Sequence, residues 1–236
     1  MSYPTPPVTT TPLSDDEFRA LAALDTCSIA NAIERFDVRL RNEGYTEQGL
    51  TCRFPKLPAM LGYACTLQVR SYAPPTKGRV YFENNDWWDF LLTIPAPRIL
   101  VVQDMDRQPG VGAVIGDVHA RILQSLGCVG VVTNGAVRDL PKVEALNFQM
   151  FSGSVSVSHG YSHVVHVGGP VQVAGLEVVP GALLHGDCHG VIRIPRNLAG
   201  RIPKAAEELQ QKEKEIIDYC QSPGFSVEGL RQIVNR

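Results

Sequence analysis

The sequence has few cysteines, no long apolar run and almost no net charge. Six cysteines in 236 residues, with no Cys-x-x-Cys pair, do not form the dense pattern of a disulfide-stapled domain. No run approaches the roughly 20 apolar residues that span a bilayer. A net charge of −2 provides no global field for nucleic acid or an anionic membrane. Neither is expected as a partner, and the thiols are expected to be free and mostly buried.

The first residues also lack the features of a secretory signal. Residues 1–12 are rich in Pro and Thr and have neither a basic region nor an apolar core. We therefore predict a flexible, extended N-terminal arm and a cytoplasmic protein. The apolar fraction of 44% is ordinary for a globular chain, and the length suits one compact domain of two or three layers.

Helix signals are found near both ends of the chain. Ser14 and Glu17 form a capping box, which predicts a helix immediately after Ser14. A second short helix is predicted from about Thr26, because apolar residues follow it at helical spacing. A polar helix rich in Glu, Gln and Lys is predicted over residues 203–220.

The centre of the chain alternates between strands and helices. Apolar strands are predicted at 63–72, 98–102, 113–115 and 129–133, and helices at 86–92, 118–126 and 139–146. The dipeptide Asn134-Gly135 is predicted to form a turn. Further β-rich segments are predicted at 155–167, 172–178 and 190–195. This order predicts one α/β domain over residues 13–200, followed by a helical extension over 201–236.

Two central loops follow a strand and open a helix, which is where α/β sheets bind ligands. In the first loop, Gly116 permits a tight turn before Asp117, and the following helix presents unpaired N–H groups that suit a carboxylate. In the second loop, Arg138 offers a planar fork for a carboxylate or carbonyl. The adjacent Asp139 offers hard oxygen ligands for Mg²⁺ or Mn²⁺. A metal beside an arginine predicts a site that polarises a 2-oxo acid.

An isolated Arg-Asp pair is more commonly a capping aspartate beside a surface arginine. Here the spacing is more specific, because Asp117 and Arg138-Asp139 form Asp-x20-Arg-Asp with a helix and a strand between them. The segments Gly116-Asp117-x-x-Ala120 and Gly135-Ala-Val-Arg138-Asp139 strongly resemble the RraA-like family. Its members include 4-hydroxy-4-methyl-2-oxoglutarate / 4-carboxy-4-hydroxy-2-oxoadipate aldolases, a class II pyruvate aldolase group, and the regulator of ribonuclease activity A.

The resemblance covers most of the chain, roughly residues 25–195. Residues 26–32 are similar to the family's first helix, with Asn31 where Asp is commoner, and residues 175–191 are similar to its closing β-segment. Ala182 departs from the family's usual Pro-Gly-Asp pattern. The resemblance implies a swivelling β/β/α single domain with helical extensions at both ends. It also implies a homotrimer or homohexamer, with sites between the subunits.

The resemblance further implies the metal chemistry of the site. Asp139 would bind Mg²⁺ or Mn²⁺, with water supplying most of the remaining ligands. Arg138 would bind the pyruvyl oxygens of a small-molecule 2-oxo acid. Asp117 would complete the outer shell of the metal and organise water.

Substrate binding and the completion of the site are implied in the same way. The backbone N–H groups of Val118 and His119, next to Gly116, would hold the substrate carboxylate. The His119 side chain is also placed to contact the distal part of a substrate. A glutamate from the C-terminal helix of a neighbouring subunit would complete the site. Glu213 fits this pattern best, and Glu215 is the alternative.

The predicted reaction is aldol cleavage of a 4-hydroxy-2-oxo acid to pyruvate and a carbonyl product. Breaking the C–C bond leaves an enolate, whose charge is stabilised by a chelated divalent metal and by Arg138. Oxaloacetate gives the same enolate when it loses CO₂, so decarboxylase activity is expected as well. The alternative is a non-catalytic, protein-binding regulator resembling the regulator of ribonuclease activity A. An acidic side chain from a neighbour near Arg138-Asp139 would distinguish the two.

Two other groups of residues indicate chemistry less strongly. His159, His163 and His166 could suggest a zinc site, but a strand or loop would separate His163 from His166. Trp87 and Trp88 could cover a pocket, although such a pair is more often part of a core or an interface. No glycine-rich phosphate-binding loop is present.

Overall fold

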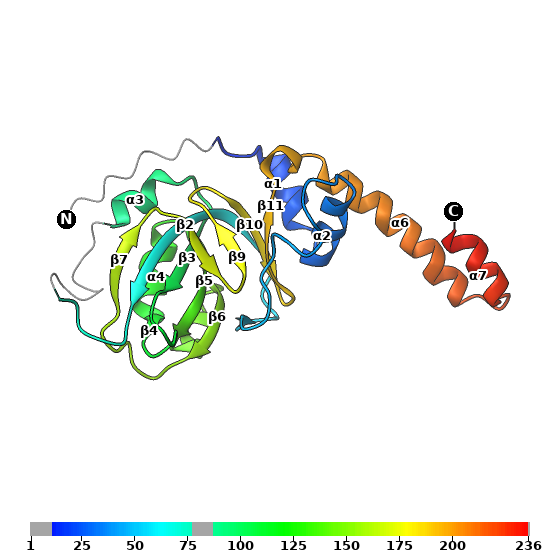
Figure 1. Ribbon diagram of the computed structural model, residues 1–236. Helices are drawn as coiled ribbons and strands as arrows, with labels where there is room; N and C mark the ends of the chain where they lie inside the picture. The colour runs from blue at the N-terminus through cyan, green and yellow to red at the C-terminus, as the bar shows by residue number, and fades with distance from the viewer. Residues whose placement is uncertain (1–10, 77–86, 236) are drawn as a thin grey trace.

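The computed structural model describes residues 11–76 and 87–235 (Figure 1). The predicted arm over residues 1–12 lies almost wholly outside the described residues, as does the predicted helix start at 86. The strands are β1 (Thr51–Cys52), β2 (Met60–Arg70), β3 (Arg98–Asp104), β4 (Ala113–Ile115), β5 (Cys128–Val137), β6 (Gln149–Val155), β7 (His163–Val167), β8 (Val171–Val173), β9 (Leu176–Val178), β10 (Leu183–Asp187) and β11 (Gly190–Ile194). The helices are α1 (Asp15–Ala22), α2 (Thr26–Glu34), α3 (Trp87–Thr93), α4 (Asp117–Ser125), α5 (Leu140–Glu144), α6 (Ile202–Cys220) and α7 (Val227–Val234).

The main sheet has a parallel centre and antiparallel edges. Its strand order is β1-β6-β5-β3-β2-β10-β11, with β4 paired to β5 and β7 paired to β2. The strands β2, β3, β5 and β6 run parallel to one another, as crossover connections through helices require. The sheet is strongly curved and nearly closed, while β8 and β9 form a separate two-stranded sheet (Figure 1).

Alternate residues of the central strands face two different cores. In β2, Leu67 and Val69 belong to the core shared with helices α1 to α6, whereas Ala64 belongs to the core shared with β8 and β9. In β3, Leu100 faces the helices and Val101 faces the β8-β9 sheet. This period of two places helices on one face of the sheet and a small sheet on the other. The predicted β/β/α architecture is therefore confirmed.

The predicted turn at Asn134-Gly135 is wrong, because β5 continues to Val137. The pairing of β5 with β6 shifts between Thr133 and Ala136, where three steps along β5 oppose two steps along β6. Such a bulge lets a strand change direction without ending. The second half of β5 then pairs with β4 in parallel.

The ends of the chain are also organised by recognisable caps. Ser14 and Glu17 form the predicted capping box of α1. Asp25 caps α2, and its Oδ1 accepts a hydrogen bond from the Ser28 N–H at 2.8 Å. The sequence did not predict β6 or α7, and only the ends of the predicted segment 155–167 are strand.

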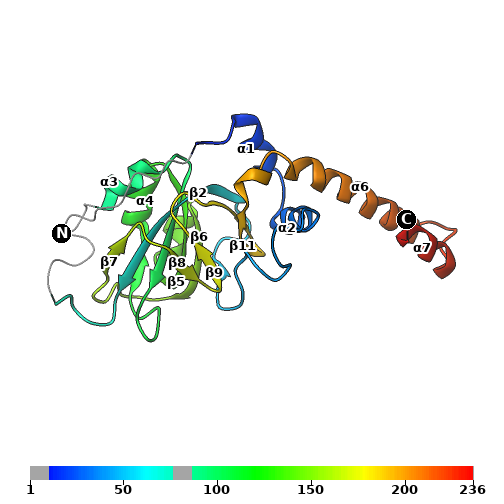
Figure 2. The same ribbon diagram turned by 45° about the horizontal axis from the view of Figure 1, so that its top comes forward.

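Helix α6 packs on the domain only through its first turns. Ile202, Ala205 and Ala206 are buried, and most of the helix after them is exposed. Figures 1 and 2 both show α6 projecting away from the sheet, with α7 folded back at its far end. Within the described residues, no helix is both long and apolar enough to cross a membrane.

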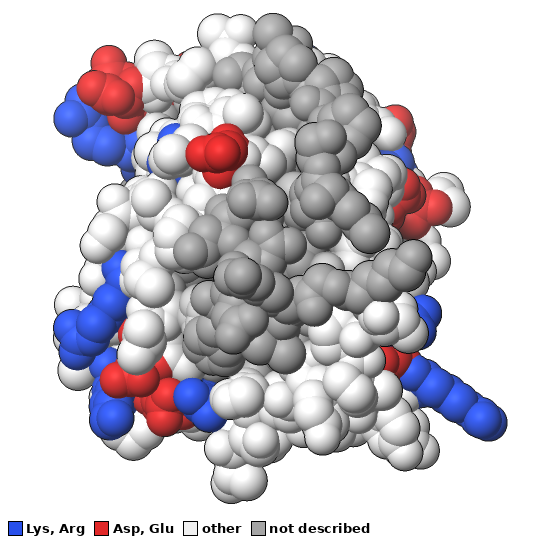
Figure 3. Space-filling view, turned by 90° about the vertical axis from the view of Figure 1, so that its left-hand side faces the viewer, with Lys and Arg blue, Asp and Glu red and all other residues white. Residues whose placement is uncertain are grey.

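The residues that the structure describes at the opposite end of the molecule form no large patch of one charge. On the described part of that face, uncharged side chains dominate, and acidic and basic side chains lie mostly toward its margins (Figure 3). This distribution agrees with the near-neutral sequence.

The six cysteines are free, as expected. Only Cys65 and Cys128 are buried, whereas Cys27, Cys188 and Cys220 are exposed. The prediction of mostly buried thiols is therefore wrong, because the exposed ones lie on an outer helix face, in a hairpin turn and at the end of a projecting helix.

Candidate active site

The strands β4 and β5 end side by side and bring the two predicted loops together. Their parallel pairing continues past β5, since the Arg138 N–H donates to the Ile115 carbonyl at 3.0 Å. As a result, Gly116 and Asp117 leave β4 next to the point where Arg138 and Asp139 leave β5. Asp117 and Arg138, which have 20 residues between them in the sequence, thus lie at one edge of the sheet.

Asp139 adopts a left-handed backbone conformation, with φ of 59°. It occupies the N-cap position of α5, yet its side chain makes no capping hydrogen bond to that helix. Its Oδ2 instead accepts a hydrogen bond from the Asp117 N–H, the first of α4, at 3.2 Å. The Arg138 Nε lies 3.4 Å from the same oxygen. The capping interpretation is therefore wrong, and the carboxylate is directed toward the N-terminus of α4.

Gly116 leaves the space that this arrangement needs. Any residue can adopt its φ of −133°, so the turn itself does not require glycine. A Cβ at this position would lie 2.5 Å from Asp139 Oδ2 and 3.0 Å from Arg138 Nε. Glycine is therefore needed for the close approach of these two side chains.

Asp117 is the first residue of α4, and its side chain is 23% exposed. Its Oδ2 lies 3.5 Å from Nζ of Lys142, which the sequence analysis missed. Partial burial raises the pKa of Asp117, but Lys142 and hydrogen bonds involving Val118 and Asp139 outweigh it and hold the pKa below its usual value. Asp117 is therefore a carboxylate at neutral pH. Lys142 lies three residues after Asp139, and this helical spacing could have indicated that its side chain lies near the site.

His119 and Val118 occupy different environments in the first turn of α4. Val118 is 60% exposed, whereas His119 is buried. Burial, together with the charges of Arg138 and His159, lowers the pKa of His119 to about 4. Its imidazole is therefore neutral at pH 7 and can take part in hydrogen bonds without adding charge.

The neighbouring strand ends are fixed by a pair of side chains that the sequence analysis also missed. Asn134 Oδ1 accepts from the Asp104 N–H at 2.7 Å, and Asn134 Nδ2 donates to the Asp104 carbonyl at 3.0 Å. The buried Asp104 carboxylate accepts from the N–H groups of Asp106 and Gly110. These contacts join the end of β3 to the bulge inside β5, before Arg138.

A family model described as RraA-like, Aldolase/RraA, matches residues 26–193. The chain belongs to the RraA-like family. This family includes aldolases and members related to ribonuclease regulators.

One curated relative of this RraA-like chain is named "Putative 4-hydroxy-4-methyl-2-oxoglutarate aldolase", from Halalkalibacterium halodurans. It is 30% identical over 103 residues, which cover 43% of this chain and 49% of the relative. The chain spans less than two thirds of the length of the first curated relatives that it matches.

Solved structures show the same RraA-like fold. A Pseudomonas syringae protein aligns with a TM-score of 0.70 and 22% identity, over 94% of this chain and 99% of that one. A Streptomyces coelicolor protein, described as an unusual member of the RNase ES inhibitor RraA protein family, aligns with a TM-score of 0.67 and 21% identity, over 86% of this chain and 96% of that one. The likeness to these structures concerns the fold.

Some of the predicted site residues stay apart within one RraA-like chain. Glu213 and Glu215 are exposed on α6, which projects away from the side that carries β4 and α4 (Figures 1 and 2). One chain by itself therefore does not bring these glutamates to Arg138 and Asp139.

The weaker candidates behave as their simpler interpretations suggest. Trp87 is buried in the core on the helix side of the sheet, and Trp88 packs against that core. Among the described residues, His159, His163 and His166 do not form a metal-binding group. The expected separation of His163 from His166 by strand alternation is wrong, because the register of β7 shifts between them and they pair with Arg70 and Gln68, which face the same side of β2.

Proposed function

We propose that this chain is a divalent-metal-dependent aldolase that cleaves 4-hydroxy-2-oxo acids to pyruvate and a carbonyl product, with oxaloacetate decarboxylase activity. One observation carries this proposal. Asp139, beside Arg138, is turned away from its own helix and held against the N-terminus of α4. Negative ligand oxygens are stabilised at such a position by the arginine, the helix N–H groups and a bound cation.

The residues at this position fit Mg²⁺ or Mn²⁺. The side chains of Asp117 and Asp139 are 23% and 29% exposed, and carboxylate oxygens are the ligands that these hard cations prefer. We assign Asp139 as the direct ligand and Asp117 to the outer shell. When bound, the cation supplies Lewis-acid stabilisation of the charge that develops as the C–C bond breaks.

The substrate is bound by groups of this chain. Arg138 has a planar fork that can contact the keto and carboxylate oxygens of the pyruvyl half. The first N–H groups of a helix have no intrahelical partner, so those of Val118 and His119 are placed to receive the substrate carboxylate. The absence of a side chain at Gly116 lets Arg138 and Asp139 approach this backbone closely. We assign the neutral His119 ring to contact the distal, carbonyl half of the substrate.

The site is completed by a second copy of the chain. We propose that residues 13–200 form the RraA-like domain and that the extension over 201–236 reaches a neighbouring subunit in a homotrimer or homohexamer. The exposed surface of α6 beyond Ala206 supports this arrangement, since a projecting helix has little contact with its own domain. Glu213 is the glutamate assigned to the neighbour's site.

The direct test is turnover of oxaloacetate by the purified protein with Mg²⁺, Mn²⁺ or Co²⁺, with pyruvate measured by a coupled assay. We expect metal-dependent pyruvate formation that a chelator abolishes. A panel of 4-hydroxy-2-oxo acids varied at C4 then identifies the tail that the site accepts. No turnover with any of the three cations would instead favour a non-catalytic, protein-binding regulator.

The contribution of the neighbouring subunit is tested with two matched variants. Glu213→Gln removes the assigned carboxylate, and Glu215→Gln removes an exposed carboxylate two residues away on the same helix. We expect a loss of about 10²-fold in kcat only for Glu213→Gln, the scale of one electrostatic contact to the transition state. The reverse pattern would move the assignment to Glu215.

A further inference from the structure

A second group of possible metal ligands lies in the turn between β10 and β11, away from the candidate active site in the sequence. Asp187 ends β10, Gly190 begins β11, and these two residues pair with each other. Cys188 and His189 therefore form a two-residue hairpin loop. One ligand atom from each of Asp187, Cys188 and His189 lies within 4.8 Å of the others, and no other such group is found in the described parts of the chain.

The distances in this turn are close to those of a zinc site. Tetrahedral Zn²⁺, with Zn–S of about 2.3 Å and Zn–N or Zn–O of about 2.0–2.1 Å, separates its ligand atoms by about 3.3–3.6 Å. Cys188 Sγ lies 3.5 Å from His189 Nδ1. Asp187 Oδ1 lies 3.0 Å from the same nitrogen. Shifts of a few tenths of an ångström would bring these two distances to the values around a bound cation, and all three ligand atoms lie within 4.8 Å of one another.

The Asp187 carboxylate is held in place by hydrogen bonds. Its Oδ2 accepts a hydrogen bond from the Thr26 N–H at 2.8 Å, which ties the turn to the start of α2. The other oxygen, Oδ1, faces the turn and lies 3.0 Å from His189 Nδ1. The carboxylate therefore presents Oδ1 to the turn as an oxygen ligand.

A hydrogen-bonded turn accounts for only part of this geometry. The His189 N–H donates to Asp187 Oδ1 at 2.9 Å, and this bond and the one from Thr26 orient the aspartate. Neither bond involves the thiol of Cys188, which lies beside the imidazole of His189 with both side chains exposed. Three side chains of metal-binding type therefore share one exposed turn.

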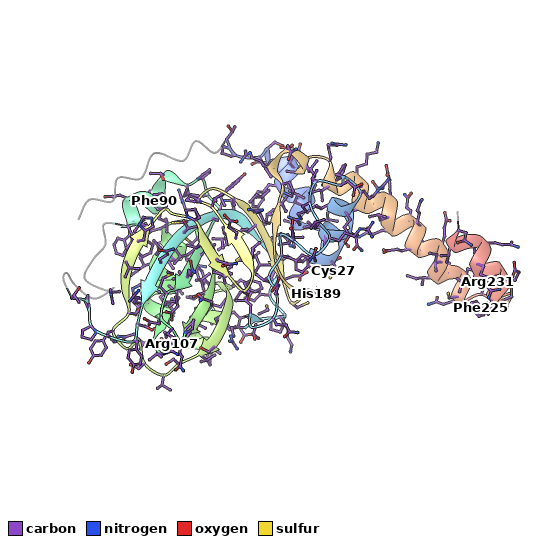
Figure 4. All side chains as sticks on the ribbon, viewed as in Figure 1. Cys27, Phe90, Arg107, His189, Phe225 and Arg231 are labelled. Atoms are coloured by element: carbon purple, nitrogen blue, oxygen red, sulfur yellow. The ribbon has the colours of Figure 1, made fainter. Side chains whose placement is uncertain are left out.

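Two further cysteines surround the turn. Cys27 on α2 and Cys52 on β1 both interact electrostatically with Cys188 and Asp187, and Figure 4 places Cys27 beside His189. Neither Cys27 nor Cys52 belongs to the group whose ligand atoms lie within 4.8 Å of one another.

We propose that Asp187 Oδ1, Cys188 Sγ and His189 Nδ1 bind a borderline-soft divalent cation of the Zn²⁺ class, with water as the fourth ligand. The cation takes the place of the proton between Asp187 Oδ1 and His189 Nδ1, and the thiol of Cys188 loses its proton on binding. Sulfur and nitrogen ligands select Zn²⁺ over Mg²⁺, whereas the Asp117 and Asp139 carboxylates select hard cations. The molecule would thus hold two cations of different class at two places.

The test is isothermal titration calorimetry of the full-length, reduced protein with Zn²⁺. Cys188→Ser and His189→Gln each remove one ligand from an exposed position, so the variants are expected to fold as the wild type does. Cys220→Ser, an exposed cysteine outside the turn, and Asp139→Asn are the matched controls. We expect one Zn²⁺ per chain and a loss of about 100-fold or more in affinity for the two ligand variants. The two control variants should change the Zn²⁺ affinity by no more than about threefold, because both residues lie outside the turn. A loss of about 10–100-fold is expected only for residues that contact the ligands.

Two independent readouts accompany the titration. Co²⁺ bound to the wild type should show thiolate-to-cobalt charge-transfer absorption that Cys188→Ser abolishes and Cys220→Ser retains. Zn²⁺ at about 100 times its Kd should raise the Tm of the wild type by about 5–10 °C, and that of Cys188→Ser by much less. Cys188→Ser should leave Mg²⁺-dependent decarboxylation unchanged.

Three outcomes would overturn the assignment. The first is no binding of Zn²⁺ by the wild type. The second is equal Zn²⁺ affinity in the wild type, Cys188→Ser and His189→Gln. The third is loss of the Zn²⁺ site in Asp139→Asn alone, which would place the cation in the candidate active site.

Discussion

Two aspartates in this molecule lie at the end of a strand and contact the first N–H of a helix. Asp139 follows β5 and accepts from the first N–H of α4 at 3.2 Å. Asp187 ends β10 and accepts from the first N–H of α2 at 2.8 Å. In both cases a negative charge is placed at the positive end of a helix.

The surroundings of the two carboxylates differ. Asp187 joins α2 to the sheet through Oδ2, while its Oδ1 faces the Cys188-His189 turn and accepts from the backbone N–H of His189. Asp139 has a longer contact, a left-handed backbone, and an arginine beside it. The same local arrangement thus ties a helix to the sheet beside the hairpin turn at Asp187, and at Asp139 it places a carboxylate next to an arginine, where a hard cation and a substrate could bind.

The largest expected effect comes from exchanging the two aspartates for asparagine. Asp139→Asn should reduce metal-dependent decarboxylation by about 10³-fold or more, since the cation loses its only direct protein anchor. Its folding should be retained, because asparagine tolerates a positive φ. Asp187→Asn should instead keep most of the activity and lose about 1–2 kcal/mol of stability, the scale of a helix cap. Coupled assays and thermal unfolding of both variants measure the contrast. Loss of turnover in Asp187→Asn but not in Asp139→Asn would show that Asp187, and not Asp139, belongs to the metal-dependent active site.

The next effect concerns the arginine that distinguishes Asp139 from Asp187. Arg138→Ala should cost about 10²–10³-fold in kcat, the scale for losing one preorganised donor to an oxyanion. Arg138→Lys should also lose most activity, because its ammonium group keeps the charge but cannot bridge two oxygens as a planar fork does. Steady-state kinetics of correctly assembled protein measure both values. Near wild-type decarboxylation by Arg138→Lys would show that the pyruvyl site lies elsewhere.

Much of the fold could be predicted from local sequence signals. The capping box at Ser14 and the apolar run at Ala113–Ile115 are short-range patterns, and the structure has the corresponding helix and strand. The path of β5 through Asn134-Gly135 could not be predicted in this way. It depends on the Asn134 side chain binding the backbone of Asp104, which is 30 positions away.

The candidate site, like the fold, could be predicted from the sequence only in part. The order of Asp117, Arg138 and Asp139 in the sequence predicted that they would meet, because parallel strands end at the same edge of a sheet. The direction of the Asp139 carboxylate, away from its own helix, is a tertiary property. The cysteines look scattered in the sequence, yet folding places Cys27 near Cys188, 161 positions later.

A smaller effect is expected on the pH dependence of stability. The pKa of His119 is lowered to about 4 by burial and by the charges of Arg138 and His159, whereas the unfolded chain has a histidine pKa of about 6.5. As the pH falls below about 6.5, the unfolded state binds a proton that the folded state does not bind. The free energy of unfolding therefore decreases until about pH 4. His119→Gln should therefore remove about 2 kcal/mol of the stability difference between pH 7 and pH 5.

Urea unfolding of the wild type and His119→Gln at the two pH values measures this difference. His163→Gln, on the partly exposed strand β7, is the matched control and should leave the slope unchanged. An unchanged slope in His119→Gln would mean that the folded protein binds a proton at His119 over the same pH range as the unfolded chain, and the site would then gain a positive charge at pH 5.

The smallest effect tests the space that lets Asp139 approach α4. In Gly116→Ala, the new Cβ would lie 2.5 Å from Asp139 Oδ2, so the carboxylate and the Arg138 side chain must shift by several tenths of an ångström. A misplacement of 1 Å at a reacting centre can cost about 10²-fold, so this smaller shift should reduce kcat/KM by about tenfold. The cost in stability should stay below about 1 kcal/mol, because the φ at residue 116 is open to alanine and the displaced atoms belong to flexible side chains. Gly224→Ala is the control, since a Cβ there meets nothing within 4 Å. Equal activity of the two alanine variants would show that the contact between Asp139 and α4 does not set the geometry of the reaction.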